Sequence, residues 1–157
     1  MSFVDGNGRA RVQGPGMKVI VGPADGARRL LLARGTLPGG GSGAVHHHDG
    51  DEVVRVVSGT VGFLVGGERK SCTAGEIAVI PRGTEHGFVV ESAEAVMEFI
   101  AEQNMGSFFT VRTSTGAVEK IEVHRAEIPW DRPPPAGQAH TSAEEMAELS
   151  RRAVEPI

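Results

Sequence analysis

The sequence predicts an all-β protein built as an antiparallel sandwich or barrel. Short runs rich in Val, Ile and Leu recur along its 157 residues, and turn-forming residues separate them. The 22 glycines are spread along the chain and are not concentrated in one linker. Many short strands need many tight turns, and glycine permits the backbone conformations that such turns require. Runs of this length and spacing favour antiparallel strands over alternating strands and helices.

The expected strands follow one another between residues 17 and 123. Each is an apolar run with β-branched residues, bounded by Gly, Pro, Asp or Ser. In chain order they are residues 17–21, 28–37, 43–48, 52–59, 60–67, 76–81, 86–92, 94–102, 107–113 and 117–123. The segments "SGT" at 58–60 and "VGGER" at 65–69 predict hairpin turns, and the Gly-Gly pair supplies the positive φ angles that a tight hairpin needs.

The end of the sequence has a different composition. Residues 128–141 contain four of the nine prolines, which predicts an extended segment on the surface. Residues 141–156 predict one short helix, because Ser142 can cap it and Glu145 follows three residues later. We therefore expect a barrel domain over residues 1–127, and a proline-rich tail with a short helix over residues 128–157. The tail is expected to pack on the barrel or on a second subunit.

Charge and cysteine content argue against several classes of protein. The formal net charge is −4 and the chain has no run of Lys or Arg, so nucleic acid is not an expected partner. The first residues lack the pattern of a secretory signal, and no segment approaches the ~18 apolar residues of a membrane span. We expect a cytoplasmic protein without a membrane partner. Cys72 is the only cysteine, which excludes an intrachain disulfide.

Three consecutive histidines, at positions 46–48, are the most unusual feature of the sequence. Successive side chains of a strand point to opposite faces, so His46 and His48 share one face while His47 points away. The acidic turn that follows brings Glu52 back beside this strand, and His86 begins a later strand after a turn. Neutral imidazoles and one carboxylate suit a divalent ion such as Fe, Mn, Co, Ni, Cu or Zn, and are poor ligands for Ca or Mg.

These two segments resemble the paired motifs of the cupin superfamily. The first motif spans residues 40–59 and the second spans residues 75–86. The family pattern usually has an Asn four residues after the second-motif histidine, where this chain has Val90. The resemblance implies a double-stranded β-helix, which is a jelly-roll barrel. It also implies a metal site whose ligands are His46, His48, Glu52 and His86.

Strand alternation predicts which residues line the interior near this site. If Glu52 and His86 point inward, alternate residues on the same strands do so as well. The expected pocket-lining residues are Val54, Val56, Phe88 and Val90. A mostly apolar pocket around one polar group is typical of a small-molecule site. The opposite face of the 52–59 strand has Val53, Arg55 and Val57. Exposure of its apolar residues would be unfavourable, so we expect a homodimer contact there.

The expected function is that of a metal-dependent protein acting on a small molecule. Four protein ligands leave two positions open on an octahedral ion, where a substrate and O₂ or water can bind together. The chain loosely resembles the small single-domain, quercetinase-like cupins. This resemblance implies an oxidoreductase that performs a dioxygenase-type oxidation of an aromatic or enolic compound, with Fe, Ni, Mn, Co or Cu as cofactor and Zn as a further possibility.

Two alternatives remain open. One is a non-redox isomerase, epimerase or lyase that acts on a sugar or keto acid, with Glu52 or a metal-bound hydroxide as the catalytic base. The other is a non-catalytic, metal-dependent protein that binds a small molecule.

Overall fold

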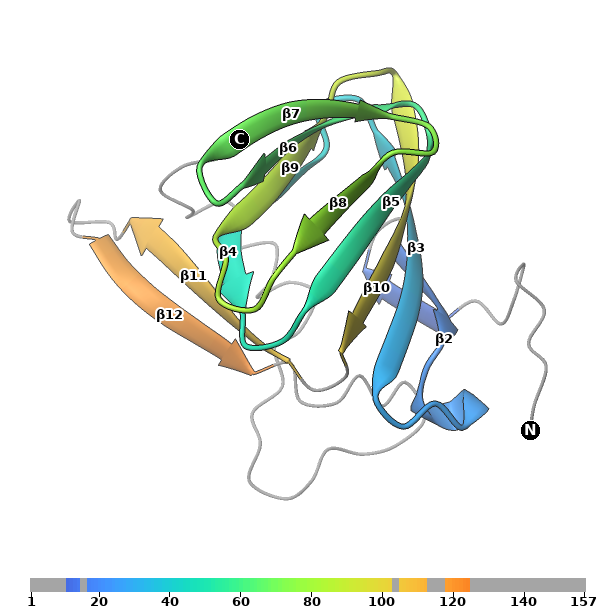
Figure 1. Cartoon of the computed structure of the whole chain (residues 1–157), viewed down its shortest axis with the longest axis vertical. Coiled ribbons are helices and arrows are strands. Elements are labelled where there is room, and N and C mark those ends of the chain that lie inside the picture. Colours follow the sequence, from blue (N-terminus) through green and yellow to red (C-terminus); the bar gives the residue numbers. More distant parts are fainter. Residues whose placement is uncertain (1–10, 15–16, 103–104, 113–117, 125–157) are drawn as a thin grey trace.

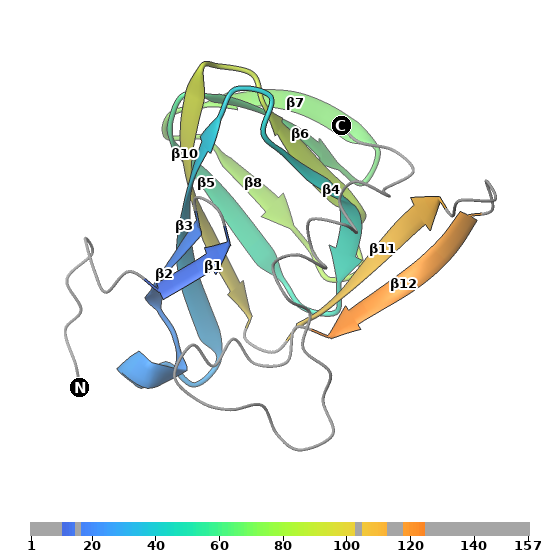
Figure 2. The same cartoon turned by 180° about the vertical axis from the view of Figure 1, so that it is seen from behind.

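The computed structural model describes residues 11–14, 17–102, 105–112 and 118–124. Within these residues the strands form two six-stranded sheets in which every paired strand is antiparallel. Figures 1 and 2 show the two sheets curving around a shared interior, which confirms the predicted all-β jelly roll. The predicted tail and its short helix lie outside the described residues.

The first sheet has the strand order β1-β2-β3-β10-β5-β8. Its members are β1 (Arg11–Gly14), β2 (Met17–Val21), β3 (Leu30–Pro38), β10 (Glu94–Glu102), β5 (Glu52–Ser58) and β8 (Ile77–Ile80). A short 3-10 helix, η1 (Pro23–Asp25), connects β2 to β3. In the part of the chain that the structure describes, no helix is long and apolar enough to cross a membrane.

The second sheet has the strand order β12-β11-β4-β9-β6-β7. Its members are β12 (Val118–His124), β11 (Gly106–Arg112), β4 (Ser42–His48), β9 (His86–Val90), β6 (Thr60–Val65) and β7 (Glu68–Thr73). The hairpin of β11 and β12 extends the sheet beyond β4, as Figure 2 shows. Strand β4 ends at His48 and strand β9 begins at His86. These two strands lie side by side in the middle of this sheet.

All ten predicted strands are present, with ends within two residues of the predicted ones. The predicted hairpin turn at 65–69 is also present, with positive φ angles at Gly66 and Gly67. Two strands were missed, β1 and β7. In β7 every side chain except that of Cys72 is exposed, so its sequence lacks the apolar alternation that indicates a strand. Pairing with β6 makes this segment a strand.

The core lies between the two sheets and consists of aliphatic, aromatic and small side chains from both. Its buried members are Val54, Val56, Val61, Phe63, Cys72, Ala78, Ile80, Val90, Ala95 and Met97. Burying one large apolar side chain of this kind contributes about 1.5–3 kcal/mol, so the core stabilises the closed arrangement of the sheets. Burial also raises the pKa of the Cys72 thiol, as expected of a small packed side chain.

The outer face of the first sheet has a row of apolar side chains across four strands. The strand register places Ile100 of β10 beside Leu32 of β3 and Val53 of β5, and Val53 beside Val79 of β8. Val79 is 64% exposed and Ile100 is 40% exposed. Exposed apolar rows of this kind are unfavourable in water. This face is where the sequence predicts contact with a second copy of the chain.

We expect the double substitution Val79→Lys and Ile100→Lys to convert a homodimer into a monomer, because two charges would then face the apolar row of the second copy. Light scattering after size-exclusion chromatography measures the mass. Glu68→Lys, on the exposed surface of β7 in the other sheet, is the control and should leave the dimer intact. A monomeric wild-type protein, or a dimer that survives the double substitution, would contradict this prediction.

Candidate metal centre

Strand β4 places two of its three consecutive histidines in one cluster. The Nε2 atoms of His46 and His48 lie 3.1 Å apart. The ring of His47 points the other way and stacks on Phe108 of β11, with ring centroids 4.8 Å apart and ring planes within 9° of parallel. The strand alternation therefore separates His47 from the other two imidazoles, as the sequence predicts.

Strand β9 contributes the third imidazole, that of His86. In the pairing of β4 with β9, His86 lies directly opposite His46, and the two ring centroids are 4.4 Å apart. Nδ1 of His86 donates a hydrogen bond to the main-chain carbonyl of Thr84 at 2.9 Å. This bond fixes the ring orientation and leaves Nε2 with its lone pair toward the other histidines.

Glu52 reaches the same point from the first sheet, where it begins β5. Its Oε2 atom lies 3.2 Å from Nε2 of His48 and 3.3 Å from Nε2 of His86. The residue is only 9% exposed. Burial by itself raises the pKa of the Glu52 carboxyl, but the proximity of the His48 and His86 imidazoles outweighs it and holds the pKa below its ordinary value. Glu52 is therefore a buried carboxylate in its ionised form.

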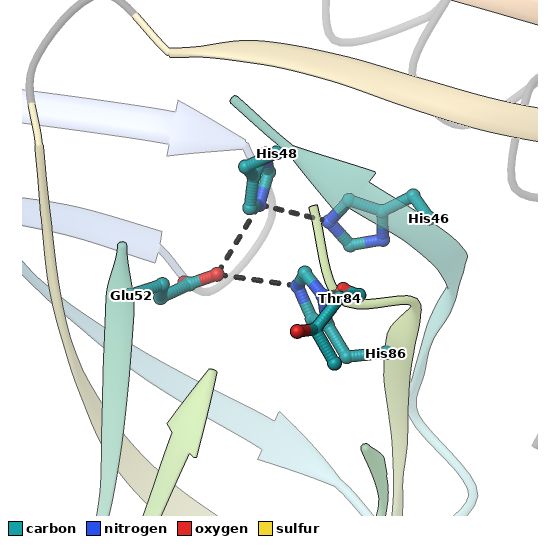
Figure 3. A network of polar contacts seen from close by, with 5 residues as sticks. All are labelled: His46, His48, Glu52, Thr84 and His86. Atoms are coloured by element: carbon teal, nitrogen blue, oxygen red, sulfur yellow. Dashed lines mark hydrogen bonds and ion pairs between the residues drawn. The ribbon is translucent and has the colours of Figure 1, made fainter. Parts of the chain in front are cut away.

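The distances among these groups fit a shared transition ion. Two ligands that lie about 2.1 Å from one ion are about 3.0 Å apart when they subtend a right angle, and about 3.4 Å apart in a tetrahedron. Three of the observed separations are 3.1, 3.2 and 3.3 Å. The nitrogen atoms that the three imidazoles offer all lie within 4.8 Å of one another. Figure 3 shows His46, His48, Glu52 and His86 pointing toward one another.

A second observation supports this fit. Nε2 of His86 is fully buried and has no hydrogen-bond partner, even though Glu52 lies close to it. A buried polar atom without a hydrogen bond is unfavourable, and most such atoms in proteins have a partner. A cation between Nε2 of His86 and the Glu52 carboxylate would satisfy both groups. The donor set fits a borderline divalent ion.

The residues predicted to line the interior lie in or against the core. Val54, Val56 and Val90 are each at most 2% exposed and belong to the same buried cluster. Phe88 is partly buried and packs against this cluster. The next two side chains along the same face of β5 as Glu52, those of Val54 and Val56, are therefore apolar and buried. Contact of these residues with a ligand remains a prediction.

Sequence reasoning did not identify the role of Thr84. It acts through its main-chain carbonyl, which accepts the hydrogen bond from His86. Every residue has such a carbonyl, so no side-chain pattern could have indicated it. Only its position, two residues before a predicted ligand in a turn, could have pointed to it.

Comparison with known proteins gives relatives for the barrel. A family model described as "Cupin domain" matches residues 33–101. A nitrosourea synthase from Streptomyces achromogenes subsp. streptozoticus is 45% identical over 62 residues, which are 39% of this chain and 13% of that protein. The chain thus corresponds to a small part of that enzyme.

Several solved structures are also similar to this chain. KdgF from Halomonas sp. has a TM-score of 0.56 at 21% identity and covers 65% of this chain and 93% of its own. The polyketide cyclase RemF from Streptomyces resistomycificus has a TM-score of 0.55 at 26% identity and covers 65% of this chain and 79% of its own. An RmlC-like cupin from Shewanella frigidimarina has a TM-score of 0.51 at 23% identity, covering 58% and 79%. The similarity to the first and third supports the fold alone.

Proposed function

Because residues 33–101 of this chain are a cupin domain, we propose that the protein is a metal-dependent enzyme acting on a small molecule. The ligands of the ion are His46, His48, Glu52 and His86. The convergence of three imidazoles and one buried carboxylate, at separations that suit one ion, is the observation that supports this proposal. The names of two relatives, a nitrosourea synthase and a polyketide cyclase, are those of enzymes.

The proposed reaction is a dioxygenase-type oxidation of an aromatic or enolic compound. When bound, a redox-active ion would make O₂ reactive toward such a compound, and a redox-silent ion would polarise a carbonyl group. Three neutral imidazoles and one carboxylate leave a net charge of +1 on a site with a divalent ion. A site of this charge among apolar side chains favours an anionic oxygen, such as that of an enolate or a phenolate.

A non-redox reaction is the second candidate, and the similarity to RemF favours it. RemF is described as a polyketide cyclase, and this similarity extends over 65% of the present chain at 26% identity. In a reaction of this kind Glu52, the carboxylate of the cluster, could accept a proton from a bound carbonyl compound. The same ligands thus suit either reaction, and the ion decides between them.

Elemental analysis and oxygen consumption test the proposal. We expect protein purified without chelator to contain Fe, Ni, Mn, Co or Cu at one ion per chain. We also expect it to consume O₂ when a flavonol or a 1,3-diketone is added. The variant His48→Ala should lose both the ion and the consumption of O₂, because it lacks one ligand.

Other outcomes separate the candidates. Stoichiometric zinc, with turnover of the diketone under nitrogen, would favour the non-redox reaction. A raised melting temperature in the presence of a compound that is never converted would favour a metal-dependent binding protein without catalysis. Wild-type protein that binds none of these ions would contradict the metal site itself.

A further inference from the structure

One turn connects the two segments that supply the ligands. The turn is formed by residues 81–84, where the main-chain N–H of Thr84 donates to the carbonyl of Pro81 at 3.0 Å. Gly83 has a φ angle of +76°, which favours glycine at this position. The main-chain N–H of Gly83 donates to the carbonyl of His48 at 2.8 Å. Because Thr84 accepts the hydrogen bond from His86, the turn contacts a ligand-bearing residue on each side.

Asp51 adds a side-chain contact to this turn. Its Oδ1 atom accepts a hydrogen bond from the main-chain N–H of Arg82 at 2.8 Å. Asp51 lies between His48 and Glu52 in the sequence, and its carboxylate bonds to the turn that precedes His86. The contact from His48 to the turn uses only main-chain atoms, whereas the contact from Asp51 uses its side chain. A substitution of Asp51 can therefore remove it.

The main chain of Asp51 is itself held by the first sheet. Its N–H donates to the carboxylate of Glu102 at 3.3 Å, and its carbonyl accepts from the N–H of Glu102 at 3.3 Å. Glu102 is the last residue of β10, a strand that pairs with β5. Asp51 therefore joins the end of the first sheet to the turn that leads into β9 of the second sheet.

We infer that Asp51 is a positioning residue for the metal site, an inference that rests on the function proposed above. Its carboxylate fixes the 81–84 turn, the turn fixes the orientation of His86 through Thr84, and the separation of His86 from Glu52 follows. Loss of this carboxylate leaves all four ligands present but lets the second-motif histidine move relative to the others. Groups that orient metal ligands in this way affect affinity although they do not touch the ion.

Titration with Co²⁺, followed by its visible absorption, tests this inference in the full-length protein. We expect Asp51→Ala to weaken Co²⁺ binding about 10- to 100-fold and to alter the absorption bands, because the ligand geometry changes. Asp51→Asn retains an oxygen that can accept from Arg82, and it should restore most of the affinity and the wild-type bands. The exposed position of Asp51 makes both variants compatible with folding, which a melting curve of each metal-free protein checks.

Glu76→Ala is the matched control. The Glu76 carboxylate also accepts a hydrogen bond from the main chain of a turn, that of Thr73, at 2.8 Å, but this turn precedes β8 and includes no ligand. The variant Glu76→Ala should therefore leave the affinity for Co²⁺ and the absorption bands unchanged. If Asp51→Ala behaves like Glu76→Ala, the inference is wrong and the metal site stands. If wild-type protein binds no Co²⁺, both are overturned.

Discussion

Substitution of His86 by alanine is expected to weaken binding of a divalent transition ion by about 100-fold or more, because it removes one ligand from a buried site. The buried Glu52 carboxylate would also lose a neighbour 3.3 Å away, which would leave it less well compensated. Isothermal titration with Zn²⁺, or competition with a chromophoric chelator, measures the affinity. His48→Ala should have an effect of the same size, since its Nε2 atom lies close to both His46 and Glu52.

His47→Ala is the control for both substitutions. It removes the same kind of side chain from the same strand, but this ring stacks on Phe108 away from the cluster. The affinity for Zn²⁺ should therefore remain close to that of the wild-type protein. Equal losses in the three variants would show that the assignment of strand faces in β4 is wrong.

Substitution of Gly59 by alanine is expected to destabilise the barrel by about 3 kcal/mol or more, because a strained backbone and a steric overlap add together. Gly59 connects β5 to β6 and has a φ angle of +82°. A Cβ atom there would overlap the carbonyl oxygen of Glu94 and would lie 2.6 Å from Oγ of Ser92 and 2.9 Å from Cα of Ala95. Two of these atoms belong to the main chain of a neighbouring strand and cannot rotate away. Denaturation in urea measures the loss.

Gly67→Ala separates the two contributions. Gly67 has a similar φ angle of +86°, but a Cβ atom there would have no neighbour within 4 Å. Only the conformational cost of about 1–2 kcal/mol is then expected. Stability losses of equal size in the two variants would show that the overlap at Gly59 is relieved by movement of the strand. A small domain has only about 5–15 kcal/mol of total stability, so the larger loss would be evident.

Much of the fold could be predicted because its strands are short apolar runs with clear turn signals. The strand β7 could not, because its side chains are exposed and only its pairing with β6 defines it. The order of the strands within the two sheets could not be predicted either, because it depends on pairing between segments far apart in the sequence. The pairing of β4 with β9, for example, brings His46 and His86 together although 40 residues separate them in sequence (86 − 46).

The clustering of His46, His48, Glu52 and His86 could be predicted from residue types, strand alternation and the resemblance to a known family. The contacts that orient these ligands could not, because they involve the main chain of the 81–84 turn and the side chain of an exposed aspartate. The identity of the ion could not be predicted either. Three imidazoles and one carboxylate accept several divalent ions, whose order of affinity depends mainly on the metal and little on the protein.

The candidate ligands come from both sheets, with Glu52 in the first and the three histidines in the second. An ion held by all four would therefore be a cross-link between the two halves of the barrel, formed without any covalent bond. Binding to the closed form alone would make the opening of the barrel and the release of the ion one coupled equilibrium. At a free ion concentration 100 times the dissociation constant, this linkage adds about 2.7 kcal/mol to the stability of the closed form. The concentration of free metal would then set the stability of the closed barrel.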